Sequence, residues 1–204
     1  IVVKELNRQL DTRVDVENID LSLIRKFPHA SLRFENIVVD PAYGKEQKLL
    51  KAKNLYLKFN LFDLIRGDYI VKKADIDDAE LLIKRNREGD YNYMIWKPAA
   101  DSLSTDTARF QFDLREVNLS NVSISYVDET AGFSLHTIAA DSRLSGRFTE
   151  KRYELGLEGD ILLNEITSYD NSFFSGQEAE IDIIFNIDQV KQQYEIEKGK
   201  LSVE

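Results

Sequence analysis

RFENIVVD, residues 33–40, is the stretch that decides the expected fold. Leu32 and Phe34 alternate with polar residues, as they would in a β-strand with one apolar face. After two polar residues the alternation resumes in the opposite phase, with Ile37 and Val39. Such a slip would turn the later side chains onto the wrong face of a sheet unless a β-bulge restored their direction.

The same slip recurs along the chain. Three copies are spaced by 18 residues and carry asparagine at the second polar position, at Asn18, Asn36 and Asn54. Two copies at wider spacing have Asp78 and Asn121 there. Asn and Asp tolerate unusual backbone angles, and the dipeptides at the slips are not the Asn-Gly or Asp-Gly pairs of two-residue hairpins. We interpret the slips as bulges, with tight hairpins as the alternative.

An internal repeat of strands predicts a mainly β fold, an elongated and curved antiparallel sheet built by stacking similar units. A β-sandwich whose strands merely look alike is the alternative. Helix is expected only in a short amphipathic segment at 3–10 and in a brief turn at 61–67 that ends with Gly67. Later strands are expected at 109–114, 134–140, 153–158, 180–187 and 194–203.

The stretch KPAADSLSTDTA, residues 97–108, is small and polar and is typical of a linker or a mobile loop. It divides the chain into an N-terminal region, residues 1–96, and a second β region, residues 109–204. We expect the second region to continue the same sheet.

Composition narrows the possible functions. The 204 residues carry 27 basic and 36 acidic side chains, a net charge of −9, which argues against binding nucleic acid or adhering broadly to anionic lipid surfaces. Binding the acyl part of a lipid stays possible. The absence of cysteine removes disulfides, thiol catalysis and cysteine zinc sites. Because the chain begins with Ile1, we expect its natural start, and any signal or membrane anchor, to lie upstream.

The search for reactive residues is mostly negative. The two histidines, His29 and His136, are far apart in sequence, and the acidic run DIDDAE, residues 75–80, lacks the glycine and the final acid of an EF-hand loop. Phosphate-binding loops and nucleophile elbows are absent. We therefore expect a protein that is not an enzyme and has no catalytic, metal or cofactor site.

What remains is the apolar face of the strands. Alternation places a strip of apolar side chains on one side and polar ones on the other. The candidate strip consists of Leu55, Leu57, Phe59, Leu81, Ile83, Val122, Ile124 and Tyr126. Most apolar strand faces are sealed cores, so the residues by themselves favour a closed core over an open groove.

The stretch from Leu10 to Trp96 resembles the N-terminal region of the AsmA-like proteins of the diderm bacterial envelope. FPHASLRFENIVVDP, residues 27–41, is similar to the family segment F-P-x-x-S-L-x-L-x-N-V-x-L-x-x-P, and residues 49–93 resemble its long signature. The matching signature positions are Leu64, Gly67, Gly89, Asn92 and Tyr93, with Glu88 where the family has its acid. A later stretch, residues 117–146, resembles a second module through Tyr126, Asp128 and Gly132.

The resemblance implies a fold, a location and a function. AsmA-like proteins, which are related to TamB and to the bridge-like lipid transfer proteins of the chorein type, are anchored in the inner membrane and hold a repeating β-groove in the periplasm. The implied function is to carry phospholipid between the inner and outer membranes in outer-membrane biogenesis. The alternative is a non-enzymatic scaffold or assembly factor for outer-membrane proteins, which would bind envelope partners through its sheet edges.

Overall fold

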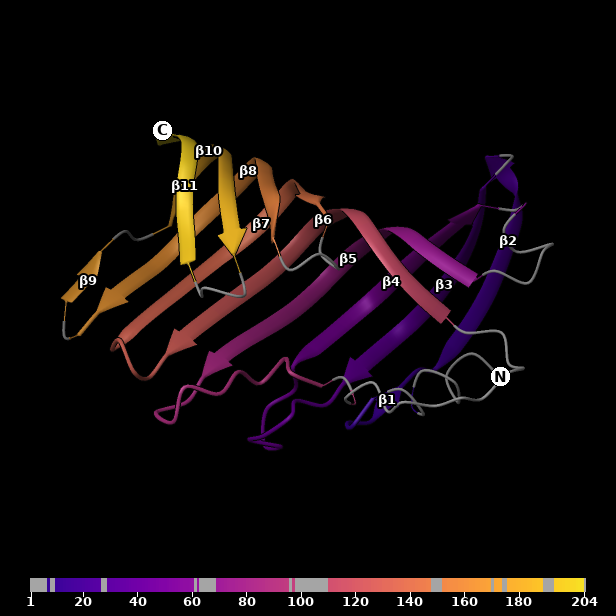
Figure 1. The fold of residues 1–204 in the computed structure, drawn as a ribbon, viewed down its shortest axis with the longest axis horizontal. Coiled ribbons are helices and arrows are strands. Elements are labelled where there is room, and N and C mark those ends of the chain that lie inside the picture. The colour runs from indigo at the N-terminus through magenta and orange to yellow at the C-terminus, as the bar shows by residue number, and fades with distance from the viewer. Residues whose placement is uncertain are drawn as a thin grey trace.

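The computed structural model describes residues 7, 10–26, 29–60, 62, 69–95, 97, 110–147, 152–169, 171–173, 176–188 and 193–203. Eleven strands follow one another across the molecule (Figure 1). Their bounds are β1 Val14–Asp15, β2 Asn18–Lys26, β3 His29–Val39, β4 Leu50–Asn60, β5 Tyr69–Arg85, β6 Phe110–Asp128, β7 Phe133–Gly146, β8 Arg152–Ser168, β9 Asn171–Phe173, β10 Gln177–Asp188 and β11 Gln193–Val203.

The strands form one sheet in the order β1-β3-β4-β5-β6-β7-β8-β10-β11, with β2 paired to β3 and β9 to β8. The prediction of a mainly β chain in one extended sheet is confirmed. The prediction that this sheet is antiparallel throughout is wrong at one place, because β5 and β6 run parallel, with Ala79 beside Val122. Parallel neighbours require a crossover, and residues 86–109 connect the two strands.

No helix is seen over either predicted helical segment, because most of both segments lies outside the described residues, although Asn7 and Phe62 have helical backbone. Of residues 3–10 the structure describes 7 and 10, and of residues 61–67 it describes 62 alone. The predicted linker, residues 97–108, lies outside the described residues except for Lys97. The sheet itself is continuous from the N-terminal region into the second β region, because β5 and β6 pair along most of their length.

Four of the five slips lie inside continuous strands, which excludes tight hairpins in β3, β4, β5 and β6, whereas the slip at Asn18 lies between β1 and β2. Asn36, Asp78 and Asn121 have φ values of 50°, 51° and 53°, in the left-handed region that Asn and Asp tolerate best among residues with a side chain. The apolar side chains before and after each slip therefore face the same side. In β3, Phe34 is fully buried before the slip and Ile37 is 3% exposed after it.

The slips differ from ordinary bulges in one respect. A bulge places two residues opposite one, but Glu35 pairs with Asn54 and Ile37 with Ala52, so β3 and β4 keep the same register on both sides of the slip. The strands from β3 to β7 change phase together at the same level of the sheet, whereas the register between β7 and β8 shifts between Ala139 and Asp141. The predicted restoration of direction is correct, whereas the predicted bulge is wrong for β3 against β4, because neither strand has an extra residue at the slip.

The sheet is strongly bent. β5 and β6 turn sharply near their beginnings (Figure 1), where the register between them shifts between Val71 and Lys73. Val71, which pairs with Phe59 of β4, is fully buried at this bend. Most buried apolar side chains form one cluster on β3 to β7, and a smaller cluster centred on Ile161 and Ile181 lies on β8 and β10.

Candidate functional site: the apolar face of the sheet

One row of apolar side chains crosses seven strands next to the slips. Its members are register partners from β3 to β10, each 9% exposed or less: Ile37, Ala52, Ala79, Val122, Ala139, Ile161 and Ala179. Four of the seven are alanine, so the side chains are short along this line. We call this row the floor row.

The predicted strip lies on the same face as the floor row, but its burial is uneven. Leu57, Phe59 and Val122 are buried, at 6%, 1% and 1% exposure. The remaining five are half-buried and pack beside the larger cluster or towards the strand ends: Leu55, Leu81, Ile83, Ile124 and Tyr126. This face therefore presents partly accessible apolar side chains on both sides of a low, buried line.

Larger side chains flank the floor row one residue pair away. Leu55 pairs with Ile76 on one side of it, and Leu81 lies beside Ile124 on the other. All four are half-buried. Four alanines therefore lie along the middle of this face, with longer side chains on either side of them.

The apolar face continues beyond the candidate strip, which ends at Tyr126, into the C-terminal strands. Ile161, Leu163, Ala179 and Ile181 are buried together on β8 and β10. The signal that could have found them is the period-two alternation within each of these strands. It was weaker because no slip with asparagine marks these strands.

The opposite face is polar and is covered by ion pairs that join neighbouring strands. They include Lys73–Glu116 at 2.9 Å, Arg143–Glu158 at 3.2 Å, Lys51–Glu80 at 3.4 Å and Lys198–Asp182 at 2.9 Å. Exposed pairs of this kind each contribute at most about 1 kcal/mol, because solvent screens them. The pairs show that this face lies in water.

The acidic run 75–80 lies on this polar face apart from Ile76 and Ala79. Asp78 accepts a hydrogen bond from Asn121 Nδ2 at 2.7 Å, which lowers the pKa of its carboxyl group. Burial, and then the neighbouring acids, raise the pKa of Asp77. The acids bond to side chains of adjacent strands, and no group of acids and histidines among the described residues could hold a metal ion.

Two shallow hollows lie on the polar face. One, of about 430 Å³, is lined by slip residues including Lys53 and Asp78, which form a pair at 3.6 Å. The other, of about 560 Å³, is lined in part by Ser125 and His136, whose Oγ and Nδ1 atoms are 3.0 Å apart. Their charged side chains bond to one another across the strands, an arrangement that favours no particular ligand.

A hydrogen-bonded cluster around Asp128, which is 7% exposed, lies where β5 and β6 end. Its carboxylate accepts bonds from the Thr130 hydroxyl, from the backbone N–H of Ala131 and from Arg85 Nη1, and these donors lower its pKa to about 2. Burial, followed by the charges nearby, raises the pKa of Tyr126 to about 12. The cluster fastens the β6–β7 turn to the end of β5.

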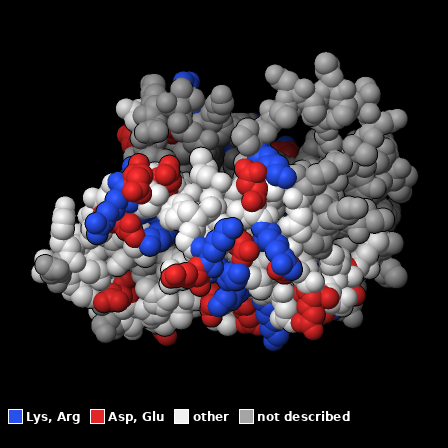
Figure 2. Space-filling view, turned by 90° about the horizontal axis from the view of Figure 1, so that it is seen from below, with Lys and Arg blue, Asp and Glu red and all other residues white. Residues whose placement is uncertain are grey.

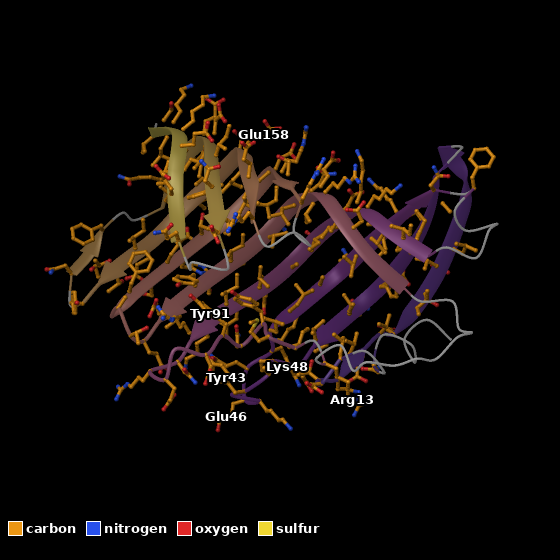
Figure 3. The ribbon with its side chains drawn as sticks, viewed as in Figure 1. Arg13, Tyr43, Glu46, Lys48, Tyr91 and Glu158 are labelled. Carbon is orange, nitrogen blue, oxygen red and sulfur yellow. The ribbon has the colours of Figure 1, made fainter. Side chains whose placement is uncertain are left out.

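The loop after β5 is fastened by a buried asparagine. Asn92 is 2% exposed, donates from Nδ2 to Leu82 O at 2.8 Å and accepts at Oδ1 from Lys84 N at 2.8 Å. Its side chain thus bonds to the backbone of β5 as a neighbouring strand would. The hydroxyl of Tyr43, which Figure 3 labels below the end of β5, donates to Lys84 O at 2.8 Å.

The signature positions named by the resemblance gather at these strand ends. Asn92, Tyr126 and Asp128 belong to the two hydrogen-bonded groups, and Gly132 ends the β6–β7 turn with a φ of 57°. Glu88 and Tyr93 are exposed. Leu64 and Gly67 lie outside the described residues. Asn92 and Asp128 act structurally here, because their hydrogen bonds connect loops to strands.

The described part of the chain contains no helix long and apolar enough to cross a membrane. Comparison with known proteins gave no match to any family model, curated protein or solved structure.

Proposed function

We propose that this chain is the periplasmic module of an AsmA-like protein anchored in the inner membrane. In this proposal it carries phospholipid along its apolar face towards the outer membrane and is not an enzyme. The observation that carries the proposal is the half-exposed apolar side chains beside the floor row, on one face of an open sheet. The resemblance of residues 10–96 to that family supports the location.

The mechanism would be passive. Acyl chains would lie on the floor row between flanking side chains such as Leu55 and Ile124, and each methylene that leaves water would contribute about 0.8 kcal/mol. The headgroup would remain in water, so no polar binding site is required. This fits a face on which the side chains of the floor row and its flanking residues are apolar, with the Arg85–Asp128 pair at the strand ends.

The test compares substitutions at two adjacent positions whose side chains point to opposite faces of the sheet. Ile124→Asp places a carboxylate on the apolar face, whereas Ser123→Asp places it on the polar face of the same strand. Delipidated protein is loaded with phosphatidylethanolamine from detergent micelles, and bound lipid is counted by native mass spectrometry. We expect Ile124→Asp to lower lipid occupancy at least tenfold and Ser123→Asp to leave it unchanged.

Two controls show whether a variant loses lipid because it has misfolded. Leu81→Ser makes a milder change in the neighbouring strand, and circular dichroism reports whether each variant retains its strands. Wild-type protein that binds no lipid under these conditions would refute the proposal. Equal occupancy in the folded Ile124 and Ser123 variants would refute it as well.

A specific observation also favours the second candidate function, a scaffold that binds envelope proteins through a sheet edge. On edge strand β11, Ile196, Leu201 and Val203 are 62%, 46% and 44% exposed and lie on the apolar face. A photo-crosslinking residue at Leu201 would form stable protein adducts in cells if this function is correct. The same residue at Ile124 would form lipid adducts if the face carries lipid.

A further inference from the structure

Five strands, β5 to β9, begin or end on the same side of the sheet, where their termini lie next to one another. The register pairs Arg85 with Asp128, Asp128 with Phe133 and Phe133 with Ser168, so the ends of these strands lie side by side at the lower left of Figure 1. The segment after β5 continues from there towards the N-terminal part of the chain, where Asn92 O accepts from Ala42 N. Four large apolar side chains are exposed in the loops at this end of the strands. They are Tyr93 at 41%, Met94 at 66%, Tyr169 at 76% and Phe173 at 52%, and together we call them the apolar rim.

Contacts with the strand ends attach two of the four rim residues, Tyr93 and Tyr169. The Tyr91 and Tyr93 rings lie 5.0 Å apart, and the guanidinium of Arg85 lies 5.5 Å from the Tyr91 ring centre. At the other end, Tyr169 N donates to Gly132 O at 2.7 Å. The two tyrosines are thus exposed while their segments stay attached to the ends of β5 and of the β6–β7 turn.

The rim continues the apolar face. A row of register partners runs from β5 to β9 just inside it, and the first four are half-buried: Ile83, Tyr126, Leu135, Ile166 and Phe173. Phe173 belongs both to this row and to the rim. Through Phe173, the rim therefore joins the same apolar face that holds the floor row.

The charges around the rim nearly cancel. Residues 84–97, 128–132 and 166–173 contain four basic and five acidic side chains, a net −1 out of the −9 of the whole chain. Two ion pairs form among these side chains, Lys84–Glu129 at 2.7 Å and Arg85–Asp128 at 3.3 Å. Seen from below in Figure 2, basic and acidic side chains are intermixed. Such a surface neither attracts anionic lipid nor is repelled by zwitterionic lipid.

We propose that the apolar rim docks onto the headgroup region of a zwitterionic phospholipid bilayer. Tyr93 and Tyr169 would place their rings at the membrane interface with their hydroxyls in water, which is where amphipathic aromatic side chains are enriched. Met94 and Phe173 would enter the acyl boundary. The proposal rests on the proposed function, since docking at this edge would bring lipid to the apolar face from the side.

The experiment measures flotation of the whole chain with phosphatidylcholine vesicles. The test variant is Met94→Ser/Phe173→Ser, and the matched control is Phe62→Ser, another exposed aromatic beyond the end of β4 at the opposite edge. We expect wild type and control to float with the vesicles and the double variant to partition roughly tenfold less, from the apolar area it no longer buries. Binding should not change between low and high salt.

Three results would overturn this proposal: no flotation of wild type, equal flotation of the double variant, or binding only to phosphatidylglycerol vesicles at low salt. A wild-type dimer that dissociates in the double variant would assign the rim to a second copy of the chain instead. Lipid loading from micelles separates this proposal from the conduit. A chain that loads lipid but shows unchanged docking in the double variant refutes the rim alone, whereas docking without loading refutes the conduit alone.

Discussion

Replacing Asn92 by alanine should destabilise the fold by about 2–4 kcal/mol. The amide side chain satisfies the carbonyl of Leu82 and the N–H of Lys84, each at 2.8 Å, and is 2% exposed. Alanine leaves both backbone groups without these partners, and a buried group without a partner costs about 1–3 kcal/mol. In a domain of this size each kcal/mol lowers the Tm by roughly 2–4 °C, so a fall of about 5–15 °C is expected.

Asn92→Asp sharpens this prediction because it keeps the shape and changes only the donor. An ionised carboxylate can still accept from Lys84 N but faces the carbonyl oxygen of Leu82 with no proton to donate. Folding should therefore raise the pKa of the new acid above its unfolded value of about 3.9. A raised acid pKa means that the folded state binds more protons, so the stability of this variant should increase as the pH falls from 7 to 5.

Urea unfolding followed by circular dichroism at pH 7 and pH 5 measures both effects. The control is Asn186→Ala, which removes an exposed hydrogen bond to Glu197 and should change the unfolding free energy by less than about 0.5 kcal/mol. An Asn92→Ala variant that matches this control would refute the reasoning. So would an Asn92→Asp variant whose stability relative to wild type falls on acidification.

Three further predictions concern the sheet itself. Gly159→Ala should lower the free energy of unfolding by at least about 2 kcal/mol, because φ is 131° and the new Cβ would lie 2.2 Å from Asp141 O. Gly176→Ala, which has open space around its Cβ, should lower it by about 1 kcal/mol. Urea unfolding measures both variants. The lowered pKa of Asp128 means that its contribution is complete above its unfolded pKa of about 3.9 and is lost as the pH falls towards 2. Asp128→Asn should therefore flatten the fall of Tm between pH 4 and 2. Phe34→Ala, at a fully buried position, should cost about 3–5 kcal/mol in the same urea assay.

The slip pattern allowed the strands and their faces to be predicted from sequence. Alternation is a local property, so Phe34 and Ile37 could be assigned to one face without knowing their neighbours. Strand direction is not local. Nothing in the alternation of β5 distinguishes a parallel partner from an antiparallel one, and the pairing of Ala79 with Val122 depends on a crossover whose path the sequence does not specify.

The candidate strip shows a similar limit. Leu55 and Leu57 are two positions apart on the same face of β4, yet one is half-buried and the other 6% exposed. Their periodicity is identical, and the difference arises from partners on other strands: Leu55 lies beside Ile76, whereas Leu57 lies beside Ala74, near the bend that buries Phe59. Sequence periodicity predicts which side a residue faces, and burial depends on long-range packing.

The floor row also relates the two candidate functions to each other. Along this row burial is maintained from β3 to Ala179 of β10, where exposure is 5%, but the next register partner, Val203 on β11, is 44% exposed. A residue in the row is buried when strands flank it on both sides, and in the described chain β11 has a neighbour on one side only. A strand supplied by a partner at this edge would cover Val203 and lengthen the floor row by one strand. Pairing at the edge and lipid on the face would then act together, because each added strand extends the apolar surface on which an acyl chain could lie.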